Sequence, residues 1–117
     1  MGSMDCATEE HDGVTIVSPR GDIDAGSVEG FQNRLDELLR DGTRYFVIDL
    51  GRVGFVDSAG LSALVRLYKR VRLGEGDVRL AGVPPQVMEI LDLTRLSRVF
   101  DIFSNSAEAA ASIKSLD

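Results

Sequence analysis

The chain has 117 residues, of which 44% are hydrophobic and 27% are charged, and its formal net charge is −6. This length predicts one compact domain with a hydrophobic core of its own. The acidic balance argues against a general nucleic-acid-binding protein, which would carry a basic patch. No apolar run approaches the roughly 20 residues that span a bilayer, so we expect no membrane insertion.

The start of the chain predicts a cytoplasmic protein. Residues 1–4 are typical of an expression-tag remnant, so we assign the domain to residues 5–117. A secretory signal peptide begins with positive charge followed by an apolar segment. This region lacks that pattern, so nothing there indicates export. Cys6 is the only cysteine, which excludes a disulfide within the chain and a cysteine-rich metal site.

The first half of the chain predicts a β-hairpin, a helix and a central strand. A β-branched strand at 13–21 is bounded by turn signals, and residues 6–11 form an edge strand paired with it. Residues 27–40 show apolar side chains at helical spacing. Residues 45–50 are almost wholly apolar, as in a central strand that is covered on both faces.

The second half predicts helices that alternate with strands. A helix at 61–73 precedes a strand at 77–82, and Pro84–Pro85 opens a further helix. A last short strand at 99–103 precedes a closing helix, for which Asn105 and Glu108 resemble a capping box. This order predicts an α/β layer fold: a single domain with a mixed, mostly parallel sheet of four to five strands and about four helices.

Ser58 is the residue on which the functional hypotheses depend. It lies in residues 55–67 (FVDSAGLSALVRL), directly before the helical pattern. As a hydrolase nucleophile it would need a glycine two positions earlier, where Val56 stands, and the only histidine, His11, lies in an N-terminal turn. As a structural residue it would be the N-cap of the helix. As a regulatory residue it would also accept a phosphate, which the positive end of a helix tolerates.

Several neighbours of Ser58 favour the regulatory hypothesis. Ala59 and Gly60 leave room for a second protein to approach, and Asp57 repels an added charge of about −1.5 to −2. Such a charge would leave the fold intact and disrupt an interface formed by this ridge. The apolar residues Val56 and Leu61 are candidate anchors for that interface, although a core role is favoured for Leu61.

Other polar residues near this segment have simpler interpretations. Asp22, Asp24 and Asp49 could add to the repulsion, and with Asp57 they raise the alternative of a magnesium site around a phosphorylated aspartate. Asp49 lies within its strand, whereas such sites use residues beyond the strand end, so we expect no metal. The basic face that includes Lys69 is a solvated face by default. A P-loop motif is not present, so we expect no resident cofactor, with ATP supplied by a partner kinase.

Three segments together resemble the STAS domains of bacterial anti-sigma factor antagonists. They are residues 19–31 (PRGDIDAGSVEGF), 47–71 (VIDLGRVGFVDSAGLSALVRLYKRV) and 80–110 (LAGVPPQVMEILDLTRLSRVFDIFSNSAEAA). The resemblance implies a STAS-like fold in which Ser58 is the phosphorylation site, with Asp24 and Asp57 beside it. Two residues depart from the family pattern: Arg95 stands where small residues are usual, and Gly26 replaces a commoner polar or small residue.

The resemblance also implies a function and its partners. The unphosphorylated protein would bind an anti-sigma factor that is a serine kinase, and so release a sigma factor. The kinase would then use ATP to phosphorylate Ser58 and dissociate the pair, and a serine phosphatase would restore the first state. STAS domains also occur in stressosomes and in lipid-transport complexes, where the same ridge would be a constitutive docking face and Ser58 only a helix cap.

Overall fold

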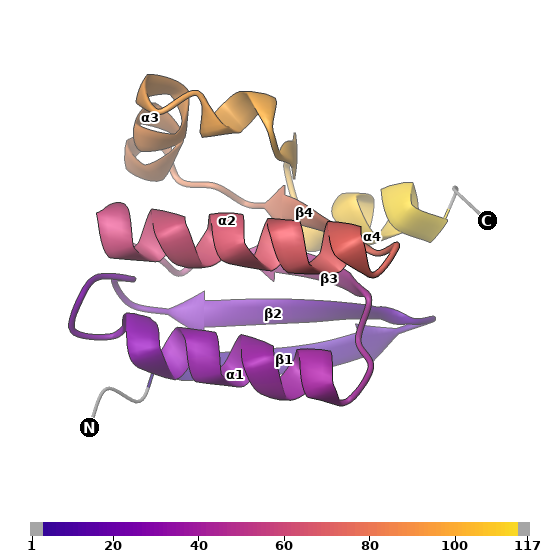
Figure 1. The fold of residues 1–117 in the computed structure, drawn as a ribbon. Coiled ribbons are helices and arrows are strands. Elements are labelled where there is room, and N and C mark those ends of the chain that lie inside the picture. Colours follow the sequence, from indigo (N-terminus) through magenta and orange to yellow (C-terminus); the bar gives the residue numbers. More distant parts are fainter. Residues whose placement is uncertain (1–3, 115–117) are drawn as a thin grey trace.

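The computed structural model describes residues 4–114, so the first three residues of the suggested tag remnant and the last three of the domain lie outside it. A five-stranded sheet in the order β1-β2-β3-β4-β5 forms the centre of the molecule (Figure 1). β1 (Asp5–His11) is antiparallel to β2 (Val14–Arg20), and the sheet continues in parallel through β3 (Tyr45–Asp49), β4 (Asp77–Ala81) and β5 (Asp101–Phe103). The predicted mixed, mostly parallel sheet is therefore confirmed.

The hairpin forms as its sequence predicts. Asp12 and Gly13 both have positive φ angles, 51° and 86°, as a tight turn between twisted antiparallel strands requires. Cys6 lies half-buried on β1, and this burial raises the pKa of its thiol.

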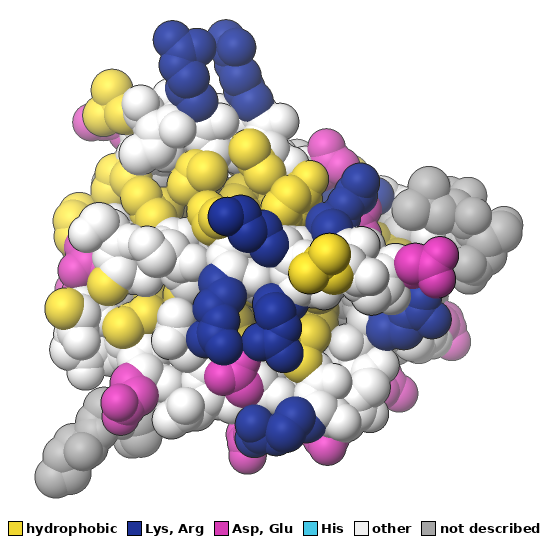
Figure 2. Space-filling model, viewed as in Figure 1, with side chains coloured by type: hydrophobic (Ala, Val, Ile, Leu, Met, Phe, Trp, Pro, Cys, Tyr) yellow, Lys and Arg dark blue, Asp and Glu magenta, His cyan; other side chains and the backbone are white. Residues whose placement is uncertain are grey.

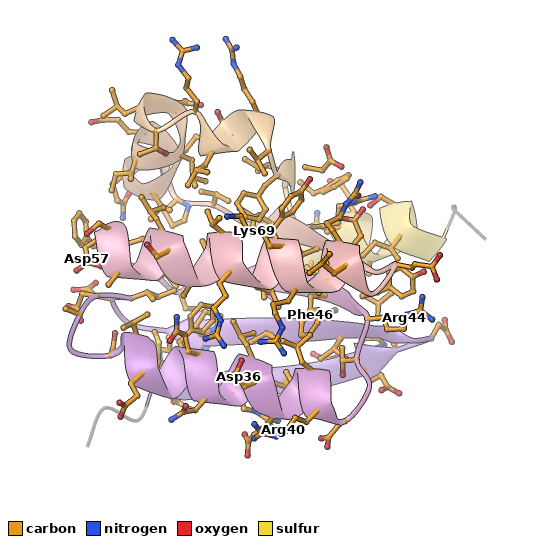
Figure 3. All side chains as sticks on the ribbon, in the orientation of Figure 1. Asp36, Arg40, Arg44, Phe46, Asp57 and Lys69 are labelled. Atoms are coloured by element: carbon orange, nitrogen blue, oxygen red, sulfur yellow. The ribbon has the colours of Figure 1, made fainter. Side chains whose placement is uncertain are left out.

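Three helices cover one face of the sheet: α1 (Val28–Arg40), α2 (Ser58–Leu73) and α3 (Pro85–Leu93). The predicted apolar stripe of α1 is confirmed, because Phe31, Leu35 and Leu38 are buried. Asp36 of α1 is partly buried and lies 3.8 Å from Arg66 and from Arg70 of α2. Figure 3 shows Asp36 on the side of α1 nearest α2. The two helices are therefore joined by ion pairs as well as by apolar packing.

The opposite face of the sheet is covered by α4 (Ser106–Lys114). Its small buried residues, Ala109 and Ala110, allow the helix to pack against Val14, Val47 and Ala81 of the strands. The Glu108 N–H donates a 2.9 Å hydrogen bond to Asn105 Oδ1, which confirms the predicted cap. β3 is thus covered on both faces, as its apolar sequence predicts.

One element is absent from the sequence prediction. A short 3-10 helix, η1 (Leu96–Arg98), joins α3 to β5, and Arg95 before it adopts a left-handed conformation with φ 64°. The predicted strand at 99–103 is correspondingly shorter, because its first residues complete this turn. Within residues 4–114, no helix has both the length and the hydropathy needed to cross a membrane.

Candidate functional site

The candidate site is built from two loops that lie side by side at the carboxyl ends of β2 and β3. The Gly21 N–H donates to the Arg52 carbonyl at 3.0 Å, and the Ile23 N–H donates to the Phe55 carbonyl at 2.9 Å. An isolated parallel β-bridge joins Ile23 to Val56, and the Asp57 N–H donates to the Ile23 carbonyl at 3.2 Å. Because the sheet pairing continues into these loops, the start of α2 is held rigidly against the start of α1.

Asp57 is the N-cap of α2, and the prediction that Ser58 caps this helix is wrong by one residue. Asp57 has an extended backbone, and its Oδ1 accepts a 3.0 Å hydrogen bond from the Gly60 N–H. Its Oδ2 accepts a 3.1 Å bond from the Ala25 N–H in the neighbouring loop. The bond from Gly60, followed in importance by that from Ala25, holds the pKa of the Asp57 carboxyl below its usual value. One carboxylate therefore caps the helix and joins the two loops.

Ser58 is the first residue of α2 and is exposed. Its hydroxyl forms no hydrogen bond within the part of the chain that the structure describes. The Ser58 side chain therefore does not cap the helix, because Asp57 does so. Figure 3 shows Asp57 at the beginning of α2, beside this position. The hydroxyl can be reached by another protein.

Two of the other predicted acidic residues, Asp24 and Asp49, stabilise turns. Asp24 Oδ1 accepts hydrogen bonds from the N–H groups of Gly26 at 3.0 Å and Ser27 at 3.2 Å, which fixes the entry into α1. Asp49 Oδ1 accepts from the Gly51 N–H at 2.9 Å, and Asp22 is exposed. Among residues 4–114, no group of three or more histidine, cysteine, aspartate or glutamate side chains is arranged to hold a metal ion.

Two predictions about the apolar and small residues near Ser58 are wrong. Val56 is fully buried beside Ile23, so it cannot anchor a partner, and the exposed apolar side chain is that of the preceding Phe55, which is 46% exposed. Gly60 is also buried: a Cβ atom there would lie 2.5 Å from the Ile23 carbonyl oxygen and 2.7 Å from a Val56 methyl. Gly60 therefore allows α2 to pack closely against the loops and does not provide access for a partner.

Ala59 and Leu61 are both partly buried, and Leu61 packs against the core, as favoured from the sequence. Leu61 also borders a groove of about 740 Å³ that runs along α2. The groove is lined by Ser58, Leu61, Ser62, Val65, Arg66, Lys69, Arg70, Leu73, Thr94 and Leu96. Figure 2 shows hydrophobic side chains gathered between α2 and the α3–η1 segment, with lysine and arginine side chains beside them.

The sequence alone did not identify this groove. Leu61 and Val65 have the spacing of core residues, and the wall opposite them comes from residues 94–96, where no element was predicted. Phe55 was missed for a related reason. Which residues of a short extended segment point inward depends on its pairing with Ile23, a contact between distant parts of the chain.

Comparison with known proteins supports the resemblance. Residues 5–109 match the STAS domain family. BtrV of Bordetella bronchiseptica, named as a candidate anti-sigma factor antagonist, is 30% identical over 108 residues, which cover 92% of each chain. The anti-sigma F factor antagonist of Paenibacillus polymyxa is 28% identical over 107 residues, which cover 91% of this chain and 92% of that protein.

A solved structure is similar over nearly the whole molecule. The anti-sigma factor antagonist from Mycobacterium paratuberculosis superposes with a TM-score of 0.87 at 26% identity, covering 97% of this chain and 96% of that one. The overall architecture described above is therefore shared with that structure. The chain belongs to the STAS domain family.

Proposed function

We propose that this protein is an anti-sigma factor antagonist, and that phosphorylation of Ser58 ends its binding to the anti-sigma factor. The observation that carries the proposal is the exposed Ser58 hydroxyl, which forms no hydrogen bond among the described residues although it stands on a rigidly held helix end. The names of the relatives supply the class of partner. We place this activity in the cytoplasm and expect no catalytic reaction by the chain itself.

In this proposal the partner protein supplies the chemistry of phosphate transfer. Ser58 Oγ would form a bond to the γ-phosphorus of ATP as the bond to the β,γ-bridging oxygen breaks and ADP leaves. The hydroxyl proton needs a base. Asp57 is poorly suited to that role, because both of its oxygens already accept hydrogen bonds and its pKa is lowered. Our proposal assigns the base and the ATP site to the partner, an anti-sigma factor with serine kinase activity, and the reversal of the step to a serine phosphatase.

The surroundings of Ser58 explain why the phosphate would change binding and leave the fold intact. The added charge of about −1.5 to −2 would stand at the positive end of α2, where the helix dipole stabilises it. The side chain is exposed and supports no hydrogen bond that the fold needs within the described residues. A partner that covers this ridge would have to bury the phosphate beside the Asp57 carboxylate, which is unfavourable.

The test is phosphorylation of the purified protein by the serine-kinase anti-sigma factor and ATP, followed by mapping of the phosphate by mass spectrometry. We expect phosphate on Ser58, no incorporation in Ser58→Ala, and unchanged incorporation in Ser62→Ala. Ser62 is a matched control because it is exposed on the same helix, one turn further along. Phosphate that persists in Ser58→Ala would contradict the proposal.

A second candidate function is a constitutive docking subunit, as in a stressosome or a lipid-transport complex. The groove beside α2 favours it, because an apolar surface can hold a partner without any modification of Ser58. Stable binding to a membrane-transport complex with no phosphate uptake would support this function over the first.

A further inference from the structure

The exposed side of α2 presents two ridges of side chains, each with one residue per helical turn. The first ridge is apolar at three of its four positions and consists of Leu61, Val65, Lys69 and Leu73. The second is polar throughout and consists of Ser58, Ser62, Arg66 and Arg70. Residues four apart lie on the same face of a helix, so both ridges run the full length of α2 along the groove.

The rest of the described chain covers the apolar ridge only in part. Leu73 is 87% exposed, and Val65, which lines the groove, is only half-buried. That wall contributes Leu96, which also packs partly against the core, so the groove has apolar side chains on both sides. An uncovered apolar surface that is bordered by polar side chains is a common kind of site for a protein partner.

The charge of the groove is opposite to that of the whole molecule. The chain carries a net charge of −6, yet three cationic side chains and, among the residues that the structure describes, no acidic one line the groove. Arg66 and Arg70 share Asp36 at 3.8 Å, whereas Lys69 has no ion pair among residues 4–114. Figure 3 shows Lys69 at the middle of α2. The groove therefore suits an acidic ligand with apolar side chains.

We propose that this groove binds an acidic amphipathic helix of the partner protein, which by the proposed function is the anti-sigma factor. The rise from Ser58 to Leu73 is about 22 Å, enough for a partner helix of about four turns. Its apolar stripe packs between Leu61, Val65 and Leu96, and its glutamate or aspartate side chains face Lys69 and the two arginines.

This arrangement connects the groove to Ser58, which lines its beginning. Arg66 lies eight residues further along α2, about 12 Å away along the helix axis. Arg66 is also engaged with Asp36 at 3.8 Å, so it offsets a phosphate on Ser58 only in part. The phosphate faces the acidic helix directly, and its charge opposes the attraction that Lys69 provides.

The groove is tested with two synthetic 16-residue helical peptides and the isotopically labelled full chain. Both peptides carry leucines at positions i, i+4, i+7 and i+11, and the flanking residues are glutamate in one and lysine in the other. We expect the glutamate peptide to shift the amide resonances of α2 and Leu96 and to bind at least about tenfold more tightly than the lysine peptide. Equal affinities, no binding of the glutamate peptide, or shifts confined to other elements would overturn the proposal.

Charge reversal then identifies the residues responsible. The variant Lys69→Glu/Arg70→Glu is expected to lose the preference for the glutamate peptide. The matched control Arg20→Glu/Arg40→Glu changes the net charge equally at exposed positions outside the groove and is expected to keep that preference. Circular dichroism establishes that both variants fold. Loss of the preference in both variants would mean that overall charge, and not the groove, attracts the peptide.

The anti-sigma factor itself separates this proposal from the proposed function. If it binds the wild type and Lys69→Glu/Arg70→Glu equally well, the groove proposal fails and the proposed function stands. If it does not bind the wild type, the proposed function fails, and the peptide experiment still decides whether the groove takes an acidic helix. We expect it to bind the double variant at least about tenfold more weakly.

Discussion

Both sides of α2 carry apolar side chains, but the surroundings of the two sides are opposite. On the inner side, Ala63, Leu64 and Leu67 are at most 2% exposed and pack against the sheet and α1. On the outer side, Val65 and Leu73 border an open groove, and Leu73 is 87% exposed. The inner side thus stabilises the fold, whereas the outer side adds apolar surface that the described chain does not cover. One helix both completes the core and offers a binding surface.

A similar division of roles separates Asp57 and Ser58, which are adjacent at the N-terminal end of α2. Asp57 caps the helix and joins the loops, whereas the Ser58 hydroxyl does neither. Ser58 can therefore be modified without loss of the cap. This separation of structural and regulatory roles between adjacent residues is what allows the surface to change charge while the fold persists.

The largest expected effect is on the free energy of unfolding, and it differs between the two sides of α2. Leu64→Ala leaves a cavity in the core and is expected to lower the free energy of unfolding by about 2–5 kcal/mol. Leu73→Ala, on the outer side, is expected to change it by less than about 0.5 kcal/mol. Urea unfolding measures both values. If the two variants lost similar stability, the outer side of α2 would be part of the core.

The next effect concerns how closely the helix start packs against the loops. Gly60→Ala places a Cβ atom 2.5 Å from the Ile23 carbonyl oxygen, and we expect a loss of about 1–3 kcal/mol. Gly74→Ala is the control, because its Cβ atom would meet no atom closer than 3.8 Å. Thermal unfolding compares them. A Gly60→Ala protein as stable as the control would show that the loops yield easily.

A smaller effect of opposite sign is expected at the far wall of the groove. Arg95 adopts a left-handed conformation with φ 64°, which costs a non-glycine residue about 1 kcal/mol. Arg95→Gly is therefore expected to raise the free energy of unfolding by about this amount. Arg95→Ala keeps the unfavourable backbone and is expected to show no gain. An equal gain in both variants would assign the effect to the arginine side chain.

The smallest expected effect depends on pH and concerns the cap. Because the folded-state pKa of Asp57 is lowered, its carboxylate stabilises the fold above the usual pKa of about 3.9, and this contribution is lost as the pH falls through the lowered value. Asp57→Asn has one side-chain oxygen in place of two, so it is expected to be less stable than the wild type at pH 7. Urea unfolding from pH 7 to pH 3 should show the two stabilities converging in acid, and a constant difference would contradict the role of the charge.

The sequence predicted the order and type of the main elements because their patterns are long. The hairpin turn, the stripe of α1 and the apolar β3 each contain several residues that agree on one structure. The site was predicted less well, because it depends on single-residue registers. Whether Asp57 or Ser58 caps α2, and whether Phe55 or Val56 points outward, is decided by hydrogen bonds to the loop that contains Ile23. Such contacts between distant segments are not encoded in local spacing.

The most direct test of the central claim is the affinity of the anti-sigma factor for the same protein with and without phosphate on Ser58. Isothermal titration at physiological salt is expected to show binding at least about tenfold weaker for the phosphorylated form. Circular dichroism and thermal unfolding of the two forms are expected to agree, since Ser58 is exposed and does not cap the helix. Equal affinities for two equally folded forms would contradict the account.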